Sequence, residues 1–158
     1  MTDKTRFLLV LHGHLPDVVG HGTWPHGANW LYEAAAECYL PFLRNVHRLR
    51  AEGVPVRATV GITPVLGEQL LDPRFATGLR WYLRQRARAA AEDREYFTKT
   101  RKPRQVQLAE SWRLIYGRLR EEFESLPGHD LLAAFRRLAD AGVLEGLARF
   151  DETGEGGI

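Results

Sequence analysis

The chain has 158 residues, of which 44% are hydrophobic and 27% charged, with a formal net charge of +2. This length fits one domain and the composition excludes a disordered chain, while the net charge is too small to imply an electrostatic partner. The single cysteine, Cys38, excludes an internal disulfide bond and is typical of a reducing compartment. We find no targeting segment and no run of ~20 apolar residues, and we therefore expect a cytoplasmic protein without a membrane partner.

The first third of the chain predicts a strand, a loop, a helix and a second strand. Phe7–Leu11 is a continuous apolar run, typical of a strand covered on both faces in a parallel sheet. A loop rich in His, Gly and Pro follows over residues 12–29, and apolar residues then recur at helical spacing up to Gly53. Pro41 should kink or interrupt this helix. Residues 54–62 then alternate as a strand, so the order predicts a βαβ unit with parallel strands.

The remainder of the chain predicts helices. We expect a short helix over 65–72, a long Arg-rich one over 73–93, a third with an apolar face from Leu108 to Phe123, and a fourth over 130–141. Residues 1–142 would form one folded unit, and residues 143–158 read as an atypical, disordered tail. Two strands are too few for a sheet that covers itself. The fold class is therefore α/β, and the pattern is that of the beginning of a larger architecture.

Four of the six histidines lie in the stretch FLLVLHGHLPDVVGHGTWPH, directly after the first strand. His12 and His14 follow the strand end, and their spacing of two points both rings to one side if the strand continues. Three interpretations stay open at this point. The rings serve as hydrogen-bonded loop residues, as metal ligands together with Asp17, or as contacts to a hydroxyl-rich substrate. Aromatic Trp24 in the same loop favours a sugar substrate.

These residues resemble a known family. The stretches HGHLP, WPHG and WLYEA, followed by GVPVRATVGITPVLGEQLLDPRF, resemble the N-terminus of glycoside hydrolase family 57, most closely its 1,4-α-glucan branching enzymes. The resemblance is strong over residues 6 to about 80 and looser through the helices. It implies the N-terminal portion of a (β/α)7 barrel, acting on α-1,4-glucans such as amylose and glycogen without a cofactor.

The resemblance also implies roles for individual residues. His12 and His14 match the substrate-contacting pair of the family, and we assign Trp24 and Glu33 to substrate binding as well. Retaining chemistry needs two carboxyl groups about 5–5.5 Å apart, which the family takes from later motifs. VLEGLARFDETGEGGI stands where the next strand motif is expected. We therefore assign no catalytic residue, and we expect the isolated chain to be poorly stable and without branching activity.

Two other functions remain as alternatives. A metal-dependent barrel hydrolase would use His12 and His14 as ligands. A nucleic-acid-binding module would use the basic stretch RWYLRQRARAAAEDREYFTKTRKPRQ, although we favour a solvated helix face as the explanation of that composition.

Overall fold

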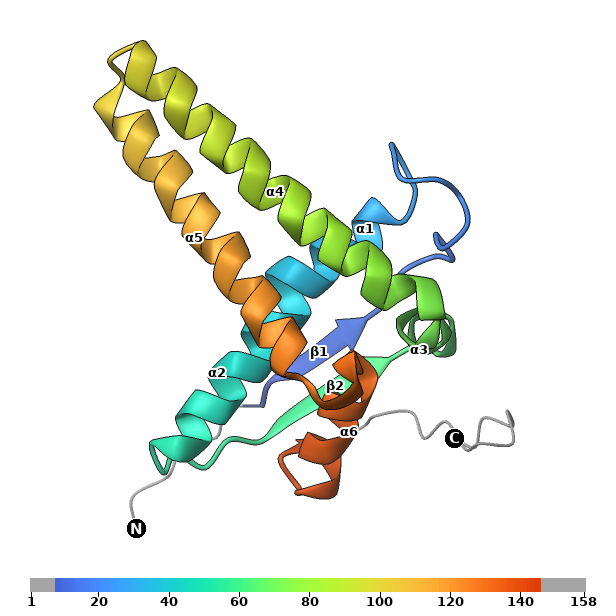
Figure 1. Cartoon of the computed structure of the whole chain (residues 1–158). Helices are drawn as coiled ribbons and strands as arrows, with labels where there is room; N and C mark the ends of the chain where they lie inside the picture. The colour runs from blue at the N-terminus through green and yellow to red at the C-terminus, as the bar shows by residue number, and fades with distance from the viewer. Residues whose placement is uncertain (1–7, 146–158) are drawn as a thin grey trace.

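The computed structural model describes residues 8–145 and has an α/β architecture (Figure 1). Three strands form a parallel sheet in the order β1-β2-β3. The strands are β1 (Val10–Gly13), β2 (Ala58–Ile62) and β3 (Leu144–Glu145). The α-helices are α1 (Asn29–Ala34), α2 (Leu40–Ala51), α3 (Pro64–Leu71), α4 (Pro73–Lys99), α5 (Pro103–Ser125) and α6 (Leu131–Asp140). The parallel β1–β2 pair confirms the predicted βαβ unit.

Before Pro41, where the sequence predicted a kink or an interruption, the helix contains a π-helical turn. This turn, Ala35–Tyr39, joins α1 to α2 without a break in the helical backbone. The amide of Leu40 donates to the carbonyl of Ala35, five residues earlier. Pro41 has no amide hydrogen and its ring would collide with the carbonyl four residues earlier, so the wider turn accommodates it.

Alternate residues of β2 point to opposite faces of the sheet. Ala58, Val60 and Ile62 are buried against helices, while Thr59 and Gly61 point the other way and are half-buried. Pairing in register places His12 opposite Gly61, on the less covered face. The core consists of the helix-covered face of the sheet and the apolar faces of the surrounding helices.

Strand β1 is more exposed than its apolar sequence predicts. Leu8, Val10 and Leu11 are 78%, 59% and 38% exposed, so the expectation of a strand covered on both faces was wrong for the described part of the chain. The physical reason is position: β1 stands at one end of the sheet order, and its outer edge is unpaired within residues 8–145.

The prediction of two strands and a tail from residue 143 also needs correction. Val143 and Leu144 are 6% and 3% exposed, and Leu144–Glu145 pair in parallel with β2 as strand β3. A strand of two residues shows no alternation in the sequence, and only its long-range pairing identifies it. The rest of the expected tail, 146–158, lies outside the described residues.

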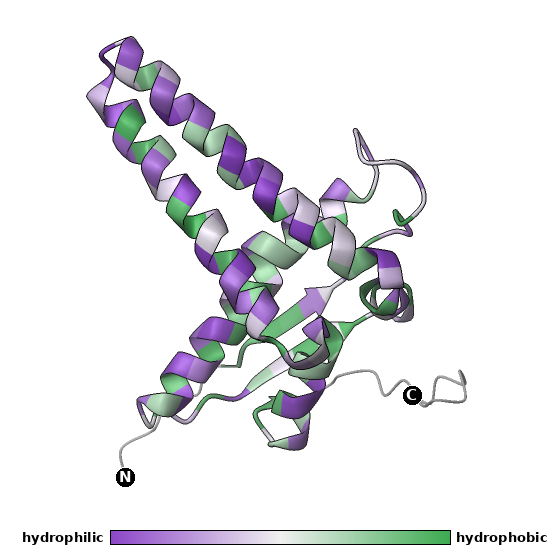
Figure 2. Cartoon of the chain, in the orientation of Figure 1, coloured by the Kyte–Doolittle hydropathy of each residue, from purple (hydrophilic) through white to green (hydrophobic). Residues whose placement is uncertain are grey.

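Helices α4 and α5 lie side by side and project from the body of the molecule as a long hairpin (Figure 1). Charged and apolar residues alternate along this hairpin, whereas β1 and β2 are mostly hydrophobic (Figure 2). Within residues 8–145, every helix is too short or too polar to cross a lipid bilayer.

Candidate functional site at the end of the first strand

His12 and His14 lie where the sequence places them, at the carboxyl end of β1. His12 pairs with Gly61 of the parallel strand β2, and His14 follows the last residue of β1. The two imidazole rings stack with centroids 6.2 Å apart and planes inclined by 12°. Both side chains are exposed. The predicted arrangement of two histidines at the rim of a parallel strand pair is therefore confirmed.

The glycines beside the histidines make room for close packing. A Cβ atom on Gly61 would lie 3.2 Å from the Nδ1 atom of His12. A Cβ atom on Gly13 would lie 3.1 Å from both the Gly61 carbonyl oxygen and the Cδ2 atom of Leu66. Such distances are tighter than ordinary van der Waals contact, so side chains at either position would displace the strand end or the ring.

A cavity of about 560 Å³ opens beside the two histidines. This volume is in the range of small-molecule binding sites. Its lining includes the two histidines, Glu33 and Glu37 from the first helical segment, Cys38 and Tyr39, and the rest of the lining is mostly apolar. The apolar lining includes Leu11, Val60, Ile62, Phe42 and Phe135. A cavity with mostly apolar walls and a few convergent polar groups suits a ligand that carries both apolar faces and hydroxyl groups.

Of the two tryptophans Trp24 and Trp30, one lines the cavity and the other does not. Trp30 lines the cavity, is 37% exposed and contacts the ring of His26 edge-on, with centroids 4.8 Å apart. Trp24 is 77% exposed and does not line the cavity. The structure thus brings His12, His14 and Glu33 together, and it leaves Trp24 apart from them.

Glu37 and Tyr39 also line the cavity, and neither was predicted as a site residue from the sequence. Glu37 lies one turn after Glu33 on the same helical face, and this spacing of four was a usable signal. Tyr39 gave no such signal. Burial raises the pKa of Tyr39 to about 12, so this cavity-lining side chain stays neutral at physiological pH.

Asp17, the carboxylate considered as a third metal ligand, does not line the cavity beside the two histidines. Among residues 8–145, no three His, Cys, Asp or Glu side chains gather closely enough to hold a metal ion.

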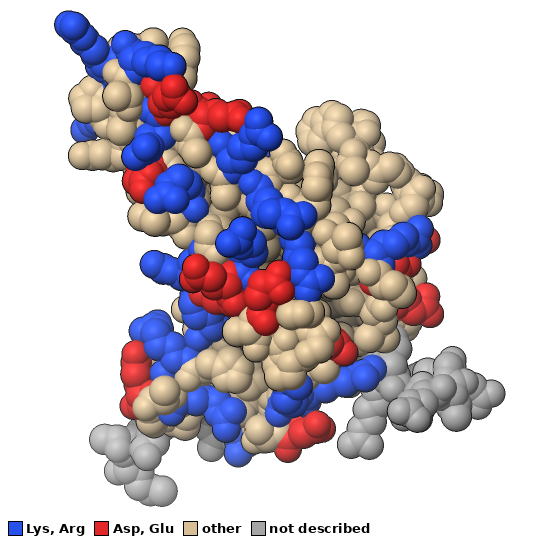
Figure 3. All heavy atoms as spheres, in the orientation of Figure 1, with Lys and Arg blue, Asp and Glu red and all other residues tan. Residues whose placement is uncertain are grey.

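The basic stretch considered for nucleic-acid binding forms most of α4 and the turn into α5. Some of its cations pair with carboxylates, and Figure 3 shows charges of both signs on one face of the hairpin. Arg88 pairs with Glu92 at 2.8 Å and Lys99 with Glu95 at 2.6 Å, both one turn apart on α4. Pairs at this spacing are typical of a solvated helix face.

No protein-family model matches the chain. Three curated proteins illustrate its sequence similarity. A 1,4-alpha-glucan branching enzyme of Thermococcus kodakarensis is 34% identical over 142 residues, which cover 90% of this chain and 20% of that protein. Probable 1,4-alpha-glucan branching enzymes of two Mycobacterium tuberculosis strains are 44% identical over 77 residues, covering 49% of this chain and 15% of each relative. The chain thus spans about a fifth or less of the curated relatives that it matches.

The fold of the chain is also similar to that of solved structures. A GH57-type branching enzyme from Pyrococcus horikoshii superposes with a TM-score of 0.83 and 31% identity, covering 89% of this chain and 26% of that one. The GH57 branching enzyme of Thermococcus kodakaraensis gives 0.74 and 30%, covering 89% and 24%. An α-amylase of Thermotoga maritima gives 0.77 and 25%, covering 89% and 26%. Over about nine tenths of its length, the chain is therefore homologous in sequence and in fold to one part of the GH57 branching enzymes.

Proposed function

We propose that this chain supplies the first part of a (β/α)7 barrel in a 1,4-α-glucan branching enzyme, and that His12 and His14 contact the glucan at the bond that is cleaved. One observation carries the proposal. In a chain homologous to part of the GH57 branching enzymes, two stacked imidazoles stand at the carboxyl end of a parallel strand, beside a cavity. The carboxyl ends of parallel strands are where α/β enzymes bind their substrates.

The chemistry of the site suits a sugar. A neutral imidazole has one hydrogen-bond donor and one acceptor, which matches a sugar hydroxyl. Glu33 and Glu37 add acceptors, and the indole of Trp30 adds an apolar ring face and an N–H donor. These groups recognise and orient the glucan, so that binding of the substrate is their contribution to the reaction.

The carboxyl groups that break and reform the glycosidic bond would come from outside the described segment. In a retaining mechanism one carboxylate forms a covalent glycosyl intermediate, and the other carboxyl group protonates the leaving oxygen. The acceptor 6-hydroxyl group of a second glucan then attacks that intermediate. Glu33 and Glu37 lie on a helical segment and not at strand ends, so we do not assign them these two roles.

A graft experiment tests the proposal. Residues 8–145 replace the matching segment of the Thermococcus kodakarensis branching enzyme, and new α-1,6 linkages in amylose are measured. We expect the hybrid to branch amylose, and we expect His14→Ala to slow it because losing a transition-state hydrogen bond costs about 1–3 kcal/mol. His47→Ala, an exposed histidine of α2 outside the cavity lining, serves as the matched control.

The same hybrid separates the glucan proposal from the metal alternative. We expect EDTA to leave its activity unchanged. Loss of activity with EDTA and recovery with zinc would favour a metal site at His12 and His14. Equal rates for His14→Ala and His47→Ala would contradict a glucan contact at His14.

A further inference from the structure

The loop that follows β1 is tied to α3 by the side chain of Gln69. Gln69 is buried, with 4% of its surface exposed. Its Oε1 atom accepts a hydrogen bond from the Val18 amide at 2.8 Å. Its Nε2 atom donates to the carbonyls of Pro16 at 3.0 Å and of Val65 at 3.2 Å. The amide group thus uses both of its donors and its acceptor.

These bonds leave His14 between two fixed points of the backbone. On one side, the Gly13 carbonyl accepts a hydrogen bond from the Thr63 amide at 3.1 Å. On the other side, the Pro16 carbonyl is held by Gln69. Both partners belong to one short segment, the end of β2 and the helix α3 that follows it. The backbone on either side of His14 is therefore fixed to a single neighbouring element.

Apolar contacts reinforce the same attachment. Val18 is 2% exposed, and the neighbouring side chains of Leu15 and Val19 pack against the core. The Val18 amide is buried together with its acceptor. Removing Gln69 would leave that amide without a partner, and an unsatisfied buried donor is costly. An amide side chain is required because it combines donors with an acceptor, whereas an ionised carboxylate only accepts.

We propose that Gln69 is a positioning residue for His14: by clamping Pro16 and Val18 to α3, it sets where the His14 imidazole stands at the end of β1. This inference depends on the proposed function in one respect, which is the identity of the ligand that His14 contacts. The placement of the ring is a property of this chain and is measurable without a sugar.

The test uses the full chain with Gln69→Met, which keeps the side-chain length and removes all three hydrogen bonds. Gln85→Met, at an exposed position on α4, is the matched control. Two signals are followed by nuclear magnetic resonance: hydrogen exchange of the Val18 amide and the imidazole resonances of His14. We expect Gln69→Met to accelerate Val18 exchange about tenfold or more and to shift the His14 resonances. We expect Gln85→Met to change neither.

A second variant keeps the test decisive if Gln69→Met does not fold. Gln69→Glu retains the acceptor for Val18 and, when ionised, loses the donors to Pro16 and Val65. Protonation restores one O–H donor. We therefore expect the Val18 amide to exchange faster in Gln69→Glu than in the natural chain at neutral pH, and the ratio of the two rates to fall toward one in acid. Gln85→Glu should exchange at the same rate as the natural chain at every pH.

The inference is overturned if a folded Gln69 variant leaves both Val18 exchange and the His14 resonances unchanged. It is also overturned if Gln69→Glu shows the same ratio at every pH. A failure of the glucan proposal is read separately, from His14→Ala in the grafted enzyme, because that measurement does not involve Gln69.

Discussion

Gly78 lies in the second turn of α4, where the phenol ring of Tyr32 packs directly against the helix. A Cβ atom at this position would overlap that ring. Tyr32 is 7% exposed and its ring also lies near those of Phe75 and Tyr82, at 6.3 and 6.0 Å between centroids. Neighbouring aromatic rings restrict the movement of Tyr32 away from α4, so the absence of a side chain at 78 sets how closely α1 and α4 approach.

Two glycine-to-alanine changes separate packing from helix propensity. Gly78→Ala should lower the urea concentration at which half of the helical circular dichroism is lost, because overpacking costs about 1–3 kcal/mol. Gly117→Ala, on α5, meets nothing within 4 Å and should raise that concentration, because glycine in a helix costs roughly 0.5–1 kcal/mol relative to alanine. Shifts in the same direction would contradict the proposed contact of Tyr32 with Gly78.

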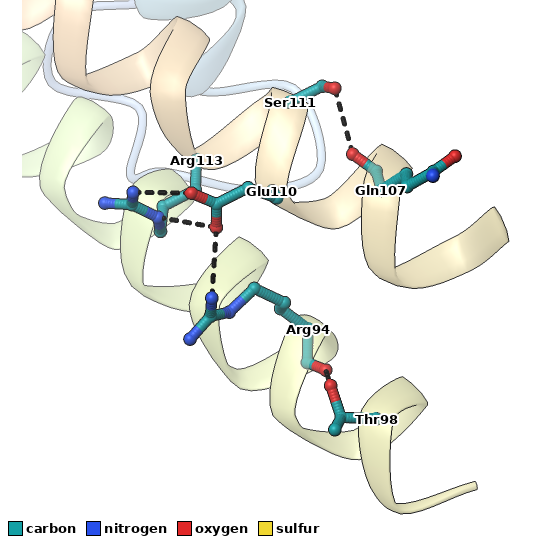
Figure 4. Close-up of polar contacts among 6 residues, drawn as sticks. All are labelled: Arg94, Thr98, Gln107, Glu110, Ser111 and Arg113. Carbon is teal, nitrogen blue, oxygen red and sulfur yellow. Dashed lines mark hydrogen bonds and ion pairs between the residues drawn. The ribbon is translucent and has the colours of Figure 1, made fainter. Parts of the chain in front are cut away.

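At the scale of elements, the α4–α5 hairpin is held in part by a shared carboxylate. Glu110 of α5 accepts hydrogen bonds from the Nε and Nη2 atoms of Arg113 at 2.9 and 2.7 Å, and it lies 3.6 Å from Nη1 of Arg94 on α4 (Figure 4). The hydrogen bonds from Arg113 are the largest cause that lowers the pKa of the Glu110 carboxyl group from its ordinary 4.5, and the charge of Arg94 adds to the effect.

Acid should weaken this hairpin in a way that depends on Glu110. A carboxyl group whose pKa is lower in the folded chain stabilises it above the ordinary pKa, and this stabilisation is lost as the pH falls through the folded value. We expect the melting temperature, followed by circular dichroism, to drop in acid. Glu110→Gln should lower the melting temperature at neutral pH and thereby reduce the size of this drop. Added salt should have a similar effect.

Glu121 provides the control for this prediction. It is an exposed residue of the same helix and takes part in none of the ion pairs found among residues 8–145. Glu121→Gln should leave the pH profile as it is. Identical profiles for the two variants would show that the Glu110 ion pairs do not stabilise the hairpin.

At the scale of the whole molecule, the sheet is incompletely covered. Val10 is 59% exposed, and the outer edge of β1 carries unpaired backbone groups within the described part of the chain. In the proposed barrel, further strands would pair with the outer edge of β1 and cover this surface. An uncovered apolar edge strand promotes association.

We therefore expect the isolated chain to bind a hydrophobic dye and to leave amylose unbranched. Val10→Thr should reduce dye fluorescence, because threonine keeps the β-branched shape and removes apolar surface. Val65→Thr, at a position of α3 that is 42% exposed, is the matched control and should have a smaller effect. New α-1,6 linkages formed by the chain alone would contradict the expectation that its catalytic carboxyl groups lie elsewhere.

Part of this architecture follows from local sequence. Helical periodicity located the helices to within a few residues at most ends, and Gly53 and Gly142 end two of them with φ of 75° and 67°. The strand–helix–strand order predicted the parallel pair, and from it the position of His12 and His14. These predictions succeeded because each depends on neighbours in the sequence or on a connection too long for a hairpin.

The tertiary structure alone decided the rest. Strand β3 is defined by its pairing with β2, and the exposure of β1 by the lack of a neighbour at its edge among the described residues. Gln69 looks like any polar helix residue in the sequence, yet it bonds to backbone groups 51 and 53 positions away. Such contacts leave no periodic signal, because the free energy of burying a polar group depends on partners that only the folded chain brings near.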